Sequence, residues 1–67
     1  MKLLKNMTIK SITGPEDIVQ RLFELGLFPD LEIEIIQKIS FNSVTVIQFD
    51  ETILALNHEE MSCLHGS

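Results

Sequence analysis

The sequence predicts an all-β protein, a small closed β-barrel of about five short strands, with one helix between the first two strands. The chain has 67 residues, which is enough for one domain, 1–67, and no more. Apolar and polar residues alternate over several short segments, as they do in half-buried strands. One segment, residues 13–26, instead repeats its apolar residues at helical spacing. We expect closure because a closed sheet leaves no exposed edges.

The helical segment carries signals for both of its ends. Thr13 is expected to cap the free amides at its start. Gly26 is expected to end it, because glycine adopts the left-handed conformation at low cost. Leu27 is then placed to fold back on Leu22, and Pro29 prevents any continuation of the helix.

The strands are expected on both sides of this helix. They are predicted at residues 7–12, 31–38, 44–49, 52–56 and 63–65. Residues 39–43 form the tip of a hairpin between the second and third strands. Asn57 is expected to cap a single helical turn before the last strand.

The charge of the chain restricts its partners. Ten acidic residues against five basic ones give a formal net charge of −5. Binding to nucleic acid or to an anionic membrane needs a clustered positive surface, so neither is expected as a partner. An acidic domain suits a neutral or basic protein surface, or a cation.

The cellular compartment is predicted from what the sequence lacks. Cys63 is the only cysteine, so no intrachain disulfide can form and a reducing environment is expected. No apolar run is long enough for a signal peptide or a membrane span. We therefore expect a soluble cytoplasmic protein without direct membrane insertion.

Catalysis is not expected. No serine lies in a nucleophile elbow, and the glycines form no phosphate-binding loop. A chain of this length also leaves little room for a deep cleft. The sequence therefore predicts a protein that binds a partner and is not an enzyme.

A metal site is one candidate for this binding. His58, Cys63 and His65 lie close together in the sequence, and their side chains suit a divalent transition metal such as Fe, Zn or Mn. The alternative is an ordinary polar segment near a chain end, with a buried cysteine that acts as a small apolar residue.

A protein-binding patch is the other candidate. Phe28 and Phe41 are expected in loops, and Leu27 lies beside the first of them. Exposed together, the three would form an apolar patch of the kind that binds proteins. The alternative is that a small barrel buries its aromatic residues.

Two segments resemble the FeoA family. Residues 21–30, RLFELGLFPD, are similar to that family's R-L-x-E-L-G-(L/M)-x-P-G. Residues 53–61, ILALNHEEM, are similar to its I-A-L-R-x-E-E-A. Two positions depart from the pattern, since Asp30 stands where the family has glycine and Asn57 where it has arginine. The resemblance covers about residues 7–65.

The resemblance implies an SH3-like barrel with a helix between its first two strands. It also implies a cytoplasmic partner of FeoB, the ferrous iron transporter, whose cytoplasmic GTP-binding region it would bind to support or regulate Fe(II) uptake. The same barrel occurs as the C-terminal domain of metal-dependent repressors resembling DtxR, so a metal-sensing module is the alternative. A homo-oligomer is a third expectation.

Overall fold

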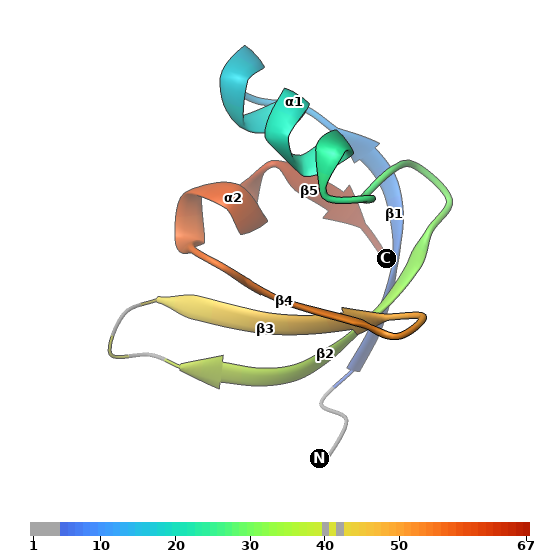
Figure 1. Cartoon of the computed structure of the whole chain (residues 1–67), viewed down its shortest axis with the longest axis vertical. Helices are drawn as coiled ribbons and strands as arrows, with labels where there is room; N and C mark the ends of the chain where they lie inside the picture. The colour runs from blue at the N-terminus through green and yellow to red at the C-terminus, as the bar shows by residue number, and fades with distance from the viewer. Residues whose placement is uncertain (1–4, 40, 42) are drawn as a thin grey trace.

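Five strands and two helices make up the computed structural model, which describes residues 5–39, 41 and 43–67 (Figure 1). Along the chain they are β1 (Lys5–Ile12), α1 (Glu16–Glu24), β2 (Glu32–Ile39), β3 (Val44–Phe49), β4 (Thr52–Leu56), α2 (His58–Ser62) and β5 (Leu64–Gly66). The strands form one antiparallel sheet in the order β4-β3-β2-β1-β5. Neither described helix is long and apolar enough to cross a membrane.

The sheet is not closed, so the prediction of a closed barrel is wrong. Within the described residues, β4 pairs only with β3, and β5 pairs only with β1. The chain between β4 and β5 forms α2, which contacts β3, β4 and β5. Because α2 lies in this connection and β5 has only three residues, the two end strands do not meet in register.

Two irregularities curve the sheet. The first half of β1 pairs with β2, and its second half, from Ile9, pairs with β5 with a shift in register between Ile9 and Ser11. In β2, Ile35 lies opposite Ile47, but the next registered residue is Gln37, which leaves Ile36 as an extra residue. Such a bulge bends a strand. It also explains why the consecutive residues Ile35 and Ile36 are both buried.

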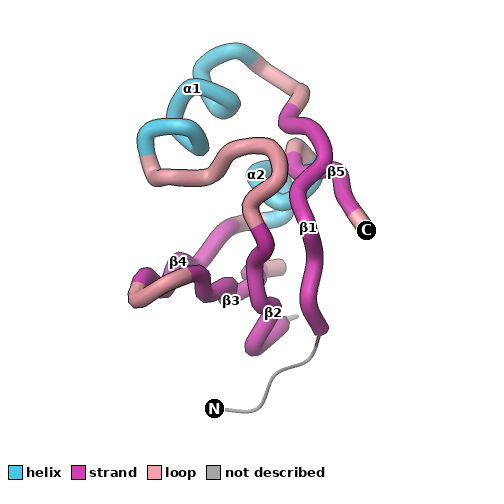
Figure 2. Tube along the Cα trace, turned by 90° about the vertical axis from the view of Figure 1, so that its right-hand side faces the viewer, coloured by secondary structure: helices cyan, strands magenta, loops and turns pink. Residues whose placement is uncertain are grey.

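The core lies between the concave face of the sheet and the apolar side of α1, which covers one end of the sheet (Figure 2). Its fully buried side chains come from four strands, from α1 and from the loop that follows α1; they are Ile9, Leu22, Leu27, Ile33, Ile47 and Leu56. The described residues include no buried polar or charged side chain. The core is therefore held by apolar packing alone.

The start of α1 differs from the prediction. Its N-cap residue is Pro15, and none of the described side chains caps the helix. Thr13 instead belongs to the β5 side of the molecule, because its amide donates to the Cys63 carbonyl at 3.0 Å. The Thr13 hydroxyl lies 2.7 Å from Nε2 of His65. Because Gly14 turns the chain between Thr13 and the start of α1, Thr13 cannot also reach the free amides of the helix.

The end of α1 is as predicted. Gly26 has a φ of +99°, which favours glycine. Its amide donates to the Phe23 carbonyl at 3.0 Å, and the Leu27 amide donates to the Leu22 carbonyl at 3.1 Å. This pair of hydrogen bonds is the Schellman motif, in which the residue after the glycine packs back on the helix. Both Leu22 and Leu27 are fully buried.

Candidate protein-binding site

The three predicted metal ligands are held apart. The buried Cys63 thiol lies 3.4 Å from the Glu59 carbonyl, to which it donates. His65 on β5 lies against Thr13, the residue that follows the neighbouring strand β1, and His58 projects from the start of α2. Among the described residues, no group of three or more His, Cys, Asp or Glu side chains is placed to hold a metal ion. These residues therefore do not form the metal centre that their spacing predicted, because α2 and β5 direct them to different surroundings.

Leu27 is not a surface residue, and the prediction that it contacts a partner is wrong. Its exposed fraction is 0%, and it packs in the hydrophobic core. The reason is the Schellman motif, which turns the chain back at Gly26 and directs the next side chain inward.

Phe28 and Phe41 are both exposed, at 49% and 92% respectively. They lie on separate surfaces, however. Phe28 belongs to the loop between α1 and β2, whereas Phe41 belongs to the β2–β3 hairpin, and Figures 1 and 2 place these two segments at opposite ends of the molecule. The structure thus offers two apolar surfaces in place of the single predicted patch.

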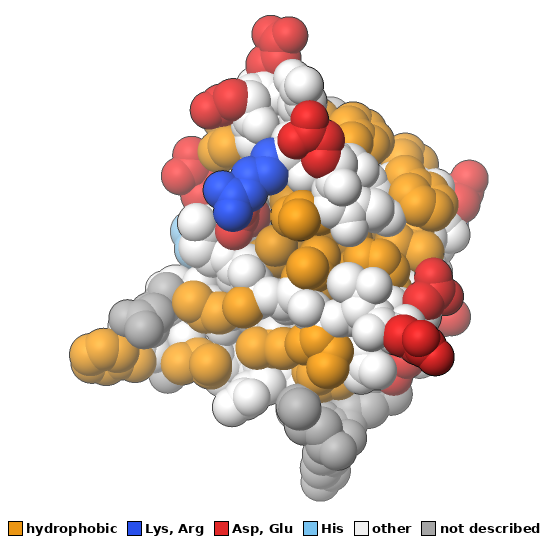
Figure 3. Space-filling model, in the orientation of Figure 1, with side chains coloured by type: hydrophobic (Ala, Val, Ile, Leu, Met, Phe, Trp, Pro, Cys, Tyr) orange, Lys and Arg blue, Asp and Glu red, His pale blue; other side chains and the backbone are white. Residues whose placement is uncertain are grey.

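One surface lies at the end of α1. Phe23 and Phe28 are each about half exposed there, at 47% and 49%. Figure 3 shows hydrophobic side chains gathered over this helix end and the following loop, with acidic side chains at their border. We call this the α1-end surface, defined by Phe23 and Phe28.

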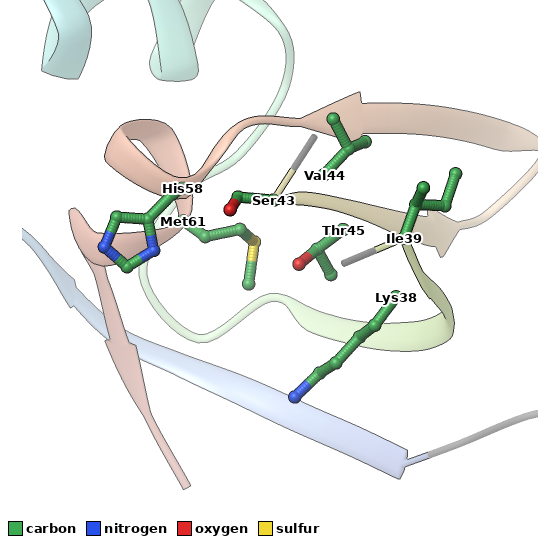
Figure 4. Close-up of a pocket in the computed structure, with 7 residues that line it drawn as sticks. All are labelled: Lys38, Ile39, Ser43, Val44, Thr45, His58 and Met61. Carbon is green, nitrogen blue, oxygen red and sulfur yellow. The ribbon is translucent and has the colours of Figure 1, made fainter. Parts of the chain in front are cut away.

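The other surface is the tip of the β2–β3 hairpin and the pocket beside it, which we call the hairpin surface. Phe41 projects from its tip, and Ile39 is also exposed. The pocket has a volume of about 260 Å³ and is lined by Lys38, Ile39, Ser43, Val44, Thr45, His58 and Met61 (Figure 4). Its walls combine apolar side chains with hydroxyl and basic groups, which suits an apolar side chain flanked by polar backbone groups.

The α2 side of this pocket is fixed by a capping box. The Asn57 side chain accepts a hydrogen bond from the Glu60 amide at 2.7 Å, and the Glu60 carboxylate accepts one from the Asn57 amide at 2.9 Å. The predicted cap at Asn57 is thereby confirmed. Since this box orients the first turn of α2, it also places His58 and Met61 at the pocket.

The pocket itself was not predicted. Its residues come from the β2–β3 hairpin and from α2, which are apart in the sequence. The sequence signals that describe each element, alternation in the strands and the cap at Asn57, do not state how α2 packs against the hairpin. Only the fold brings His58 and Met61 beside Thr45.

The fold and its exposed loops define a class, a small all-β domain that presents apolar side chains at its surface. The family can be stated as well. The model of the FeoA domain matches residues 1–66, so this chain belongs to the FeoA domain family, as its two sequence motifs predicted. FeoA domains are accessory, non-catalytic domains, and membership of the family suggests a role in ferrous iron transport.

A solved structure supports the fold. The solution NMR structure of protein PA4359 from Pseudomonas aeruginosa is similar to this chain with a TM-score of 0.80 and 19% sequence identity. The similarity covers 98% of this chain and 91% of the other. No curated protein sequence matches this chain.

Proposed function

We propose that this chain is a cytoplasmic accessory protein of ferrous iron transport. In this proposal it binds the cytoplasmic GTP-binding region of a FeoB-like transporter and supports or regulates Fe(II) uptake. Membership of the FeoA domain family is the observation that carries the proposal. The curved five-stranded sheet with α1 at one end agrees with an SH3-like barrel that is left open between β4 and β5.

The hairpin surface is the contact that we propose for this partner. Phe41 is 92% exposed, so almost its whole ring can be removed from water on binding. Full burial of such a side chain is worth about 1.5–3 kcal/mol. Aromatic side chains that fill a partner's pocket are also typical centres of binding energy.

The neighbouring pocket adds a second point of contact. Ile39, Val44 and Met61 offer an apolar lining for one side chain of the partner. The hydroxyls of Ser43 and Thr45 offer hydrogen bonds beside this lining, and Lys38 adds an ammonium group that extends away from them (Figure 4). With a protruding aromatic residue beside a pocket, each protein can insert a side chain into the other.

The charge of the chain agrees with a neutral or basic partner surface. The formal net charge is −5, and acidic residues are distributed over the exposed sides of the strands and helices. Opposite charge on the partner would raise the association rate, and this part of the attraction would weaken as salt increases.

Calorimetric titration against the purified GTP-binding region of the transporter tests this proposal. Phe41→Ala is expected to weaken binding at least about tenfold, because loss of roughly 1.4 kcal/mol corresponds to that factor. Phe28→Ala is the matched control, since it truncates the same side chain on the α1-end surface. We expect it to bind as the unmodified chain does.

Three results would contradict parts of the proposal. Unchanged binding by a folded Phe41→Ala variant would remove the hairpin surface from the interface. Weaker binding by Phe28→Ala alone would move the interface to the α1-end surface. No binding by the unmodified chain would reject the GTP-binding region as the partner.

A further inference from the structure

The strand β4 has an unpaired edge that is not protected. It lies at one end of the sheet and, within the described residues, pairs only with β3. Its sequence, TILAL, contains no charged residue and no proline, and its pairing with β3 runs without a bulge. Edge strands of monomeric proteins commonly contain a charged residue, a proline or a bulge, because an unprotected edge pairs with other chains. We propose that β4 pairs antiparallel with β4 of a second copy, which joins the two sheets about a two-fold axis.

The β3–β4 turn determines which backbone groups face this edge. Phe49 lies opposite Thr52, so the hairpin has a two-residue loop. In a hairpin of this kind the pair that flanks the loop exchanges hydrogen bonds, and bonded pairs then alternate with non-bonded ones. The N–H and C=O groups of Ile53 and Ala55 consequently point away from β3. They are free to bond a second strand.

The direction of pairing decides where the acidic turns lie. Asp50 and Glu51 form the turn before β4, whereas Asn57, His58, Glu59 and Glu60 follow its end. If Leu54 lies on the two-fold axis, antiparallel pairing keeps the two acidic turns at opposite ends of the paired strands. A parallel pairing would set the two acidic turns side by side, which costs energy in a chain that already carries a net charge of −5.

In the same register, dimerisation would bury apolar side chains on the outer face of the β3–β4 hairpin. Ile53 is 55% exposed, and Ala55 is exposed beside it on that face. On β3, Val46 lies opposite Ala55 and is half-buried. Antiparallel pairing places Ile53 of each copy opposite Ala55 of the other. The apolar strip that Figure 3 shows along the β3–β4 hairpin would then continue from one copy into the next.

The edge is accessible in the fold. Figure 2 shows β4 at the outer end of the curved sheet, on the side away from β1 and β5. The helix α2 contacts β4 but leads away from it toward β5. A second strand can therefore add to β4 without displacing another described element. This inference is independent of the function proposed above.

Sedimentation of the full chain over a wide concentration range tests the inference. The unmodified protein is expected to approach twice its mass of 7.6 kDa as its concentration rises. Ala55→Pro removes the amide that faces the free edge and leaves the bonds to β3 in place, which an edge position tolerates. It is expected to weaken dimerisation at least about tenfold, because each dimer loses two hydrogen bonds.

Two further variants separate strand pairing from other effects. Ala55→Thr keeps the amide and a side chain that suits strands, so we expect it to dimerise as the unmodified chain does. Ile53→Lys places a blocking charge on the edge while it reduces the net charge from −5, so a loss of the dimer cannot come from greater repulsion. Ile53→Lys also tests pairing at the β4 edge if Ala55→Pro does not fold.

The inference is overturned by any of three results. If the unmodified chain stays monomeric at all concentrations, a second copy is rejected as the occupant of the edge. The second contrary result is that Ala55→Pro and Ile53→Lys, shown to be folded by circular dichroism, dimerise as tightly as the unmodified chain. The third is that Ala55→Thr loses the dimer as completely as Ala55→Pro, which would assign the contact to the side chain and not to the backbone.

Discussion

The loop after α1 and the β2–β3 hairpin were both predicted to face a partner, and they have opposite structures. The first is tied to its surroundings from both sides. Gly26 and Leu27 bond back to the helix, the Asp30 amide donates to the Ile9 carbonyl at 2.6 Å, and the Ile9 amide donates to the Leu31 carbonyl at 2.9 Å. The hairpin instead raises an aromatic ring, 92% exposed, away from the sheet.

This difference separates residues that hold the fold from residues that are free to bind. A loop whose backbone groups bond to two neighbouring elements is part of the core's support, and changes in it affect the free energy of unfolding. A projecting side chain makes few contacts in its own molecule, so its loss affects stability little. The following substitutions test this comparison, from the largest expected effect to the smallest.

Leu27→Ala is expected to have the largest effect. Truncation of a fully buried leucine costs about 2–5 kcal/mol, and Leu27 is fully buried. A domain of this size has roughly 3–5 kcal/mol of stability from its core. We therefore expect most of the variant to be unfolded, as measured by circular dichroism in a urea titration. A folded variant with an unchanged midpoint would show that the loop after α1 is not part of the core.

Gly26→Ala is expected to cost about 1–2 kcal/mol, the penalty of a left-handed conformation for a residue with a Cβ. The added methyl group would lie 3.5 Å from the Phe49 ring, an ordinary contact, so the cost comes from the backbone. Urea denaturation measures it. Gln20→Ala, on the exposed side of α1, is the control, with a change of less than about 0.5 kcal/mol. Equal effects of the two variants would contradict the role of the Schellman motif.

Asp30→Ala is expected to cost about 1 kcal/mol or less. Asp30 has a φ of +76°, and aspartate tolerates this region better than alanine does. Asp30→Gly is the control, since glycine removes the strain but gains freedom in the unfolded chain. We expect glycine to be more stable than alanine in thermal unfolding. The reverse order would show that the left-handed backbone conformation at this position is not what limits the stability of the alanine variant.

Phe41→Ala is expected to change the free energy of unfolding by less than about 0.5 kcal/mol. The ring is almost wholly exposed, so its removal leaves no cavity. The same urea titration measures this value and shows that any loss of partner binding is not a loss of fold. A destabilisation as large as that of Gly26→Ala would place the ring in a contact within the molecule.

Much of the fold follows from local signals in the sequence. Gly26 ends α1, Leu27 packs on Leu22, and Asn57 caps α2, because each of these depends on residues a few positions apart. Leu27 was nevertheless assigned to the surface as well. Its packing on Leu22 already places it in the core, since a side chain cannot be fully buried and also contact a partner.

Long-range packing accounts for the differences. The bulge at Ile36 depends on the register between β2 and β3, which the alternation of β2 alone does not contain. Thr13 lies against His65 because β1 and β5 pair, so it was lost as a helix cap. The same pairing draws His65 away from Cys63 and His58. The candidate metal ligands were close in sequence, but Cys63 bonds to the Glu59 carbonyl and His65 lies against Thr13, so their side chains have different surroundings.

The division of β1 between two partners has a consequence for how the domain folds. Its first half is paired once β2 exists, but its second half waits for residues 64–67, where Leu64 lies opposite Ile12 and the Ser67 carbonyl accepts from the Thr8 amide at 2.9 Å. During synthesis these residues emerge after every other strand. Ile9 and Ile12 therefore lack part of their cover until then, and the domain completes its folding in one late step after translation of β5.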